Sequence, residues 1–470
     1  MMNLRKIILI PALIIAFISG FISCGVDRWP EYAHQTALDS WMYDIMQQNY
    51  LWYGSMPSYD DVNLFLDPAG FLAKVKASND SYSFVDSVME TPLPTYGFDY
   101  SLVRSQDIDT AYNALVTYVI PGSPAEKAGL QRGNWIMKVD TSYISKKYET
   151  ALLQGTQARD LVMGVWKEVI PEVEEGEEEP EPVYKVVPND ITLKMGAAQI
   201  VEDNPFHKSE ILDLSTGKVG YLMYNSFTAG TKDDPEKYNN ELREWSAELA
   251  QENIHKVILD LRYNAGGTLD CVQLLSTILA PSYYLDQNMT FLEYNDKNID
   301  KDATLTFDQQ LLKNGKNLDL NTLIVLISGE TTGAPEMLMN NLNNKVQKLI
   351  GIGSSTKGQN VATEKFINEE FSWAVNPVVC TVYNSEHDTF SGGFQPHYSV
   401  SSSTDYSTFL PFGDPKEALL SVAIGVLEGT YPPTDPDEPE TETTSSKSIK
   451  IEKSVSSPAS RKFIRGLQLK

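Results

Sequence analysis

Histidine and cysteine, two residue types that often act in catalysis or bind metals, are few in this chain and widely spaced. The chain has five histidines without a metal-ligand spacing: His34, His207, His255, His387 and His397. Cys271 and Cys380 stand far apart and form no disulfide-framework pattern, so each is interpreted as a small buried hydrophobe. The sequence therefore predicts no structural metal, and no cofactor is expected.

More informative stretches lie in the second half of the chain, where short apolar strands lead into glycine-containing loops. The first is 257–267, Val-Ile-Leu-Asp-Leu-Arg-Tyr-Asn-Ala-Gly-Gly. An expected strand at 323–327 precedes 331–336, Thr-Thr-Gly-Ala-Pro-Glu, which opens a helix. Another strand at 348–352 precedes 353–361, Gly-Ser-Ser-Thr-Lys-Gly-Gln-Asn-Val. Strands and helices alternate here, which predicts a mixed α/β domain.

These motifs resemble peptidase family S41, the C-terminal processing or tail-specific proteases, in the form found in Bacteroidetes lipoproteins. The order of segments agrees with that family: export signal, helical domain, PDZ-like domain, protease-like core and a closing segment. The resemblance covers about residues 30–430. It implies an α/β multidomain protein with an N-terminal helical cap and a core of the ClpP/crotonase-like kind. The implied partner is a polypeptide.

Members of that family use a serine nucleophile with a lysine base. A serine hydroxyl attacks only when a base removes its proton, and a buried lysine can do so because burial lowers its pKa. The negative oxygen that develops during attack needs fixed N–H donors. The resemblance assigns this oxyanion loop to Gly266 and Gly267, although a tight turn after a strand also requires glycine.

The two catalytic positions do not match the family's pattern. In register with it, the serine position falls on Gly333, which has no side chain, and the lysine position falls on Gln359. Glutamine cannot accept a proton at neutral pH. Lys357 is an alternative base, because two residues along a strand return to the same face. Ser328 and Thr332 are the alternative nucleophiles.

Residues 114–140 resemble the PDZ domains of bacterial proteases, with a strand, a Gly/Pro turn, one helical turn and a second strand. A PDZ groove binds an extended peptide by strand addition and captures its C-terminal carboxylate on backbone N–H groups. The predicted peptide-binding loop is Thr95, Tyr96, Gly97 and Phe98, with Thr95 where glycine is usual. A domain that only braces its neighbour remains an alternative.

The N-terminus has the features of an export signal. Arg5 and Lys6 precede an apolar run over 7–21, which is short for a membrane span. The run ends at Ser23 and Cys24, which resembles a lipobox in which Cys24 is acylated; ordinary signal cleavage is the alternative. We therefore expect an exported cell-envelope lipoprotein, periplasm-facing or on the outer membrane surface, held to the membrane by its lipid.

Composition limits the remaining choices. The 470 residues leave room for about three domains. With a net charge of −25, the chain does not have the excess of basic residues that nucleic-acid binding needs. The expected segments are a signal peptide at 1–24, a helical domain at 27–90, a PDZ-like domain at 91–200 with an acidic insertion at 171–182, a core at 205–430, and a disordered linker and basic tail at 431–470.

Local sequence patterns bear on the N-terminal helical domain and on the C-terminal tail. Apolar residues at helical spacing predict a helix through Leu38, Trp41, Met42, Ile45 and Met46, and a second helix is expected from Pro68. The basic tail has one alternative interpretation, an interaction segment built on residues 461–465.

Three functional hypotheses follow. The preferred one is a non-catalytic homologue that binds extended or C-terminal polypeptide segments. The second is an active serine endopeptidase that uses Ser328 or Thr332 with Lys357. The third is a structural protein of the envelope that interacts through its acidic loop and basic tail.

Overall fold

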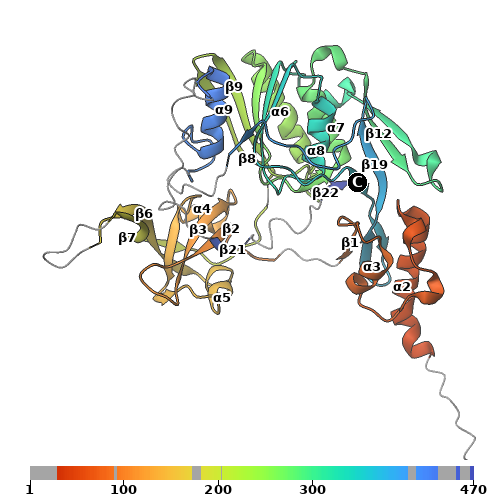
Figure 1. The fold of residues 1–470 in the computed structure, drawn as a ribbon, viewed down its shortest axis with the longest axis horizontal. Coiled ribbons are helices and arrows are strands. Elements are labelled where there is room, and N and C mark those ends of the chain that lie inside the picture. The colour runs from red at the N-terminus through yellow and green to blue at the C-terminus, as the bar shows by residue number, and fades with distance from the viewer. Residues whose placement is uncertain are drawn as a thin grey trace, which may run out of the picture.

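The computed structural model describes residues 29–88, 93–171, 181–202, 204–400, 409–431, 451–455 and 466–469. The chain folds into an N-terminal helical region, a β-rich domain and an α/β core, which are the lower right, lower left and upper parts of Figure 1. The predicted α/β multidomain architecture is therefore confirmed. Cys24 and most of the acidic insertion lie outside the described residues.

The N-terminal region contains the two helices predicted from the sequence. These are α2 (Trp29–Asn49) and α3 (Pro68–Val75), with the 3-10 helices η1 (Tyr53–Ser55) and η2 (Tyr59–Asp61) between them. The first turn of α3 is capped by Asp67, whose side chain accepts the N–H of Gly70 at 2.9 Å.

This region is joined to the core rather than standing alone. Strand β1 (Phe84–Ser87) pairs with β18 (Trp373–Asn376), which also pairs with β17 (Phe366–Asn368). The hydrophobic cluster of the helices includes Val361 and Val375 of the core. Part of the predicted helical domain is thus a strand that belongs to an arm of the core.

The β-rich domain is one antiparallel sheet in the order β2-β3-β4-β6-β7, with β5 beside β4. Its strands are β2 (Phe98–Arg104), β3 (Tyr112–Val119), β4 (Trp135–Val139), β5 (Ser142–Tyr143), β6 (Arg159–Val169) and β7 (Val183–Met195). Two short helices, α4 (Pro124–Lys127) and α5 (Glu149–Leu153), cover it. The predicted strand, helical turn and strand over 114–140 correspond to β3, α4 and β4.

The core has a main sheet in the order β20-β15-β14-β10-β9-β8, parallel except between β8 and β9. Its strands are β8 (Phe206–Leu214), β9 (Gly217–Tyr224), β10 (Lys256–Asp260), β14 (Thr322–Ile327), β15 (Lys348–Gly353) and β20 (Tyr398–Ser399). One face packs on α6 (Lys237–Gln251), α7 (Leu269–Leu279) and α8 (Ala334–Leu342), and the other on α9 (Ala418–Glu428).

A second sheet of the core has the order β11-β22-β16-β19-β12-β13. It consists of β11 (Gly266–Thr268), β22 (Gly466–Gln468), β16 (Val361–Thr363), β19 (Val378–Asn384), β12 (Asn288–Tyr294) and β13 (Ala303–Thr306). The 3-10 helices η3 (Ser282–Tyr284), η4 (Ile299–Lys301) and η5 (Gln309–Leu312) lie in its connections.

The C-terminal tail differs from the expectation of disorder over 431–470. Strand β21 (Ile451–Val455) pairs with β2 of the β-rich domain, and β22 enters the second sheet of the core. Composition favoured disorder because the segment is rich in proline and charge, but β21 and β22 are short runs whose backbone groups find partners on distant strands.

Candidate active site

The glycine loop after β10 is held by an asparagine. The side chain of Asn264 donates to the carbonyl of Tyr224 at 2.8 Å and accepts the N–H of Gly266 at 3.1 Å. Gly266 and Gly267 have φ of 136° and 142°, so this backbone suits glycine. Both residues are buried and form β11, at the edge where the predicted nucleophile helix begins.

Gly333, at the predicted serine position, lies directly before α8 and has φ 70° and ψ −97°. A side chain is strained in this conformation, so the turn suits glycine. The N–H of Gly333 donates to Glu336 at 2.8 Å, and its carbonyl accepts from Met337 at 2.8 Å. The turn between β14 and α8 is therefore fixed by Glu336 and has no side chain at residue 333.

Glu336 fastens this turn to the loop that contains the predicted base position. Its fully buried carboxyl group accepts the N–H of Gly333 on one oxygen, together with the N–H of Gln359 at 2.9 Å. The other oxygen accepts the hydroxyl of Thr356 and the N–H of Gly358. Glu336 belongs to the motif at 331–336, but its contacts with residues 356–359 were not predicted from the sequence. A glutamate three residues into a helix is the signal that could have identified it.

The predicted base position, Gln359, and its alternative, Lys357, differ in solvent exposure. Gln359 has 1% of its surface exposed, and its amide donates to the carbonyl of Val361 at 3.1 Å. Lys357 is exposed, although its backbone N–H donates to Thr331 at 3.1 Å. The buried position is thus the one that holds glutamine, whereas Lys357 is exposed.

The two alternative nucleophiles have other partners. The hydroxyl of Ser328 donates to the carbonyl of Arg262, and that of Thr332 donates to the carbonyl of Glu330 at 2.9 Å. Neither hydroxyl is hydrogen-bonded to Lys357 among the contacts of the described chain segments. The structure therefore does not bring the members of the alternative dyads into hydrogen-bonding contact.

One residue of the tail connects the three predicted positions. A Cβ placed on Gly333 would lie 2.7 Å from the carbonyl carbon of Gly466, and one placed on Gly266 would lie 2.5 Å from the same atom. A Cβ placed on Gly466 would in turn lie 2.5 Å from the Cδ of Gln359. The positions expected for nucleophile, oxyanion loop and base thus converge on Gly466. We call the strand position between β11 and β16, which β22 fills, the cleft.

The predicted peptide-binding loop of the β-rich domain is already engaged within the chain. The N–H of Thr95 donates to Gln199 at 2.8 Å, and the N–H of Gly97 donates to the Thr95 hydroxyl at 3.0 Å. Tyr96 is buried, and Phe98 begins β2. Carboxylate capture on these two N–H groups would require their present bonds to break, whereas the edge of β2 is the place where β21 pairs.

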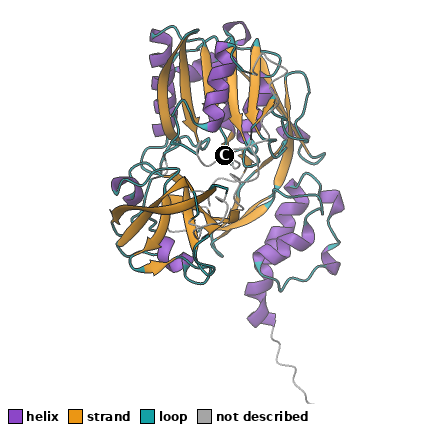
Figure 2. Ribbon diagram, turned by 60° about the vertical axis from the view of Figure 1, so that its left-hand side comes forward, coloured by secondary structure: helices purple, strands orange, loops and turns teal. Residues whose placement is uncertain are grey.

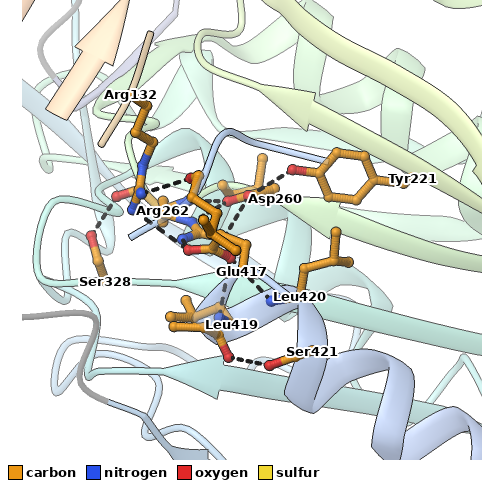
Figure 3. Close-up of polar contacts among 12 residues, drawn as sticks. Arg132, Tyr221, Asp260, Arg262, Ser328, Glu417, Leu419, Leu420 and Ser421 are labelled. Carbon is orange, nitrogen blue, oxygen red and sulfur yellow. Dashed lines mark hydrogen bonds and ion pairs between the residues drawn. The ribbon is translucent and has the colours of Figure 1, made fainter. Parts of the chain in front are cut away.

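A buried charge cluster joins the β-rich domain to the core (Figure 3). Arg262, one residue beyond the buried Leu261 after β10, bonds to Asp260 at 2.9 Å and to Glu417 at 2.6 Å. Arg132 of the β-rich domain approaches the same Glu417 oxygen at 3.5 Å, and the hydroxyl of Tyr221 donates to Asp260 at 3.0 Å. The cluster fixes the strand that precedes the glycine loop.

The protonation of this cluster follows from its geometry. Burial alone would raise the pKa of Glu417, but Arg262 and Arg132 outweigh it and hold that pKa below its usual value. Burial alone would lower the pKa of Arg262, but Asp260 and Glu417 raise it, so Arg262 stays charged. Glu417 also caps α9, because it accepts the N–H groups of Leu419 and Leu420.

Two features are absent from the described residues. Within them, no three His, Cys, Asp or Glu side chains are grouped in a way that could hold a metal ion. Nor is any helix in these segments both long and apolar enough to cross a membrane. Cys271 and Cys380 are both buried and free.

Comparison with family models divides the chain as the structure does. Residues 37–84 match the "Peptidase S41 N-terminal domain", residues 115–167 match "PDZ domain", and residues 218–400 match "Peptidase family S41". These matches correspond to the helical region, the β-rich domain and the core.

Individual relatives agree. A crystal structure from Bacteroides fragilis described as "Putative S41 protease" is 42% identical, with a TM-score of 0.76, over 83% of this chain and 97% of that one. A "Probable CtpA-like serine protease" of Staphylococcus aureus is 26% identical over 53% of this chain and 42% of its own length. A "Carboxyl-terminal-processing protease" of Picosynechococcus is 26% identical over 53% and 51%. The chain thus matches about half the length of these curated relatives.

Proposed function

The chain belongs to peptidase family S41, and we propose that it binds extended polypeptide segments without cleaving them. The proposal concerns the chemistry within the family fold. The fold supplies a cleft that accepts a strand, whereas the positions expected for a nucleophile and a base carry Gly333 and Gln359.

The observation that supports this most is the environment of Gly333. Its backbone keeps the strained turn, and Glu336 keeps the turn against the loop of Gln359. Glycine has no atom that can form an acyl-enzyme, and the amide of Gln359 cannot take up a proton at neutral pH. A cleft with this geometry retains the means to hold a peptide but has no group to attack it.

Cleavage and binding are measured together to test the proposal. The chain from Asp27 is incubated with a reduced, carboxymethylated and fluorescently labelled polypeptide. Anisotropy reports binding, and mass spectrometry reports new termini. We expect saturable binding and no new termini during a day of incubation. Turnover that Lys357→Ala abolishes, together with loss of turnover in Ser328→Ala or Thr332→Val, would instead establish the alternative dyad.

A gain-of-function variant provides the positive control. Gly333→Ser with Gln359→Lys introduces the serine and the lysine of the family's pattern. Leu467→Asp is added to displace the backbone of residue 466, which would clash with a side chain at residue 333. The triple variant is expected to produce new termini, whereas Leu467→Asp alone is not. Persistent inactivity of the triple variant, with peptide binding intact, would show that these are not the catalytic positions.

Export and lipidation are part of the same proposal. Arg5, Lys6, the apolar run and Cys24 are its support. Cells that express the full chain with an alkyne-bearing fatty acid are expected to label it, and Cys24→Ala is expected to abolish labelling. A labelled Cys24→Ala chain, or an unlabelled parent in the envelope fraction, would contradict the lipid anchor.

A further inference from the structure

The tail already occupies the cleft. Strand β22 lies between β11 and β16 and runs parallel to both, next to the label C in Figure 1. In Figure 2 the label C lies at the lower side of the core. The N–H of Gly466 donates to Ala265 at 2.7 Å, and the N–H of Leu469 donates to Thr363 at 3.0 Å. The tail is therefore hydrogen-bonded on both sides, as an inserted peptide would be.

The first position of this strand favours glycine. Gly466 is buried and has φ 65°, a conformation that side chains rarely adopt. A Cβ there would overlap the amide of Gln359. The carbonyl carbon of Gly466 lies so close to Gly333 and Gly266 that neither could carry a side chain without moving the strand. Residues 266, 333 and 466 thus permit three backbones to approach one another.

The next position selects an apolar side chain. Leu467 is completely buried in the main hydrophobic cluster of the core, and β22 contacts the start of α8. The hydroxyl of Thr363 donates to the carbonyl of Leu467 at 3.3 Å. Burial of this whole leucine side chain is the main apolar contribution in so short a segment.

Charge favours the same occupant. Residues 447–470 contain seven basic side chains and one glutamate, in a chain whose net charge is −25. A basic segment approaches an acidic body readily, at least at low ionic strength. The tail is thus both the ligand that fits the cleft and a segment that the rest of the chain attracts.

We propose that the cleft is a self-occupied strand-binding site, with residues 466–469 of the same chain as its resident ligand. Its external ligands are then extended polypeptides of the same class, a glycine followed by a leucine with basic residues nearby. This inference rests on the proposed peptide-binding function and names its ligand. A tethered ligand has an effective concentration in the millimolar range, so external peptides enter only by displacing it.

The test uses a fluorescent peptide with the sequence of residues 459–470 and the full mature chain. Gly466→Val and Leu467→Asp are expected to release the tail and to bind this peptide at least about 30-fold more tightly than the parent does. The matched control is the same peptide with valine in place of its Gly466, which is expected not to bind. Amide exchange at 466–469 should be slow in the parent and fast in both variants.

A rescue separates a specific contact from general damage. Gln359→Ala in the background of Gly466→Ala removes the overlapping amide and is expected to restore part of the amide protection at 466–469. Unchanged thermal unfolding of the single variants, followed by far-ultraviolet circular dichroism, verifies that they fold.

Each outcome bears on one proposal. Equal peptide affinity in parent and variants would overturn self-occupancy while leaving peptide binding intact. Protection at 466–469 that rises with protein concentration would place the tail in a second copy and would also overturn it. Cleavage of the peptide by the parent would instead overturn the proposed function.

Discussion

The tail contacts the chain in two places, and they differ in what they require of it. In the cleft, β22 has a neighbour on each side, is parallel to both, and places a glycine and a leucine in fully buried positions. At the β-rich domain, β21 lies at the edge of the sheet and is antiparallel to β2 alone. The cleft thus selects side chains, whereas the edge of β2 accepts a backbone.

The largest difference in stability is expected between the loss of two carboxyl groups, one beside the cleft and one in the β-rich domain. Glu336→Ala leaves four buried hydrogen-bonding groups without their acceptor and should lower the free energy of unfolding by about 3–5 kcal/mol. Glu126→Ala, in the β-rich domain, removes one exposed bond to Gly122 and should cost less than about 1 kcal/mol. Urea unfolding of both variants measures the difference. Similar losses would show that the cleft is not held together by Glu336.

A smaller difference is expected between the two anchors of the tail. Leu467→Ala removes a fully buried side chain, so local opening of 466–469 should become easier by about 2–3 kcal/mol. Ile451→Ala removes a partly buried side chain at the edge and should change opening of 451–455 by less than about 1 kcal/mol. Amide exchange by mass spectrometry reports both segments in one experiment. An Ile451 effect as large as that of Leu467 would remove the distinction.

The features that could be predicted from the sequence also differ between the cleft and the tail. The strands around the cleft could be predicted because each is a short apolar run with glycine at or just after its end, as at Gly329 after β14 and Gly353 in β15. The role of Glu336 was missed because its partners at 356–359 are distant in sequence. The strands of the tail were missed because a short segment that pairs only with remote strands carries no periodicity of its own.

A substitution in the loop 95–98 of the β-rich domain is expected to strengthen peptide binding there, as side-chain selection does in the cleft. Thr95→Gly removes the hydroxyl that accepts the N–H of Gly97, which frees that N–H for a peptide carboxylate. We expect about fivefold tighter binding of a peptide with a free C-terminus, equivalent to about 1 kcal/mol, and no change for the same peptide with a C-terminal amide. Isothermal titration with both peptides measures this. An equal gain for the amide would show that the loop does not recognise the carboxylate.

The smallest effect is expected from mild acidification at the junction of the two regions. Because the pKa of Glu417 is lowered in the folded chain, its contribution to stability is complete above its usual pKa and is lost only as pH falls through the lower folded value. The difference in unfolding free energy between the parent and Glu417→Gln should therefore be constant from pH 8 to about pH 5.5 and shrink only in stronger acid. Urea unfolding across this range measures it. A difference that shrinks between pH 7 and pH 6 would contradict the lowered pKa.

The close approach of Gly333 and Gly466 has an evolutionary consequence. The backbone of Gly466 and Leu467 occupies the volume that a side chain at residue 333 would need. A chance Gly333→Ser mutation would therefore clash with the tail. Loss or change of the tail would have to come first, and only then could a serine be tolerated. Each glycine therefore makes the other harder to replace, and a chain that has both cannot acquire a side chain at residue 333 in a single step without moving the tail.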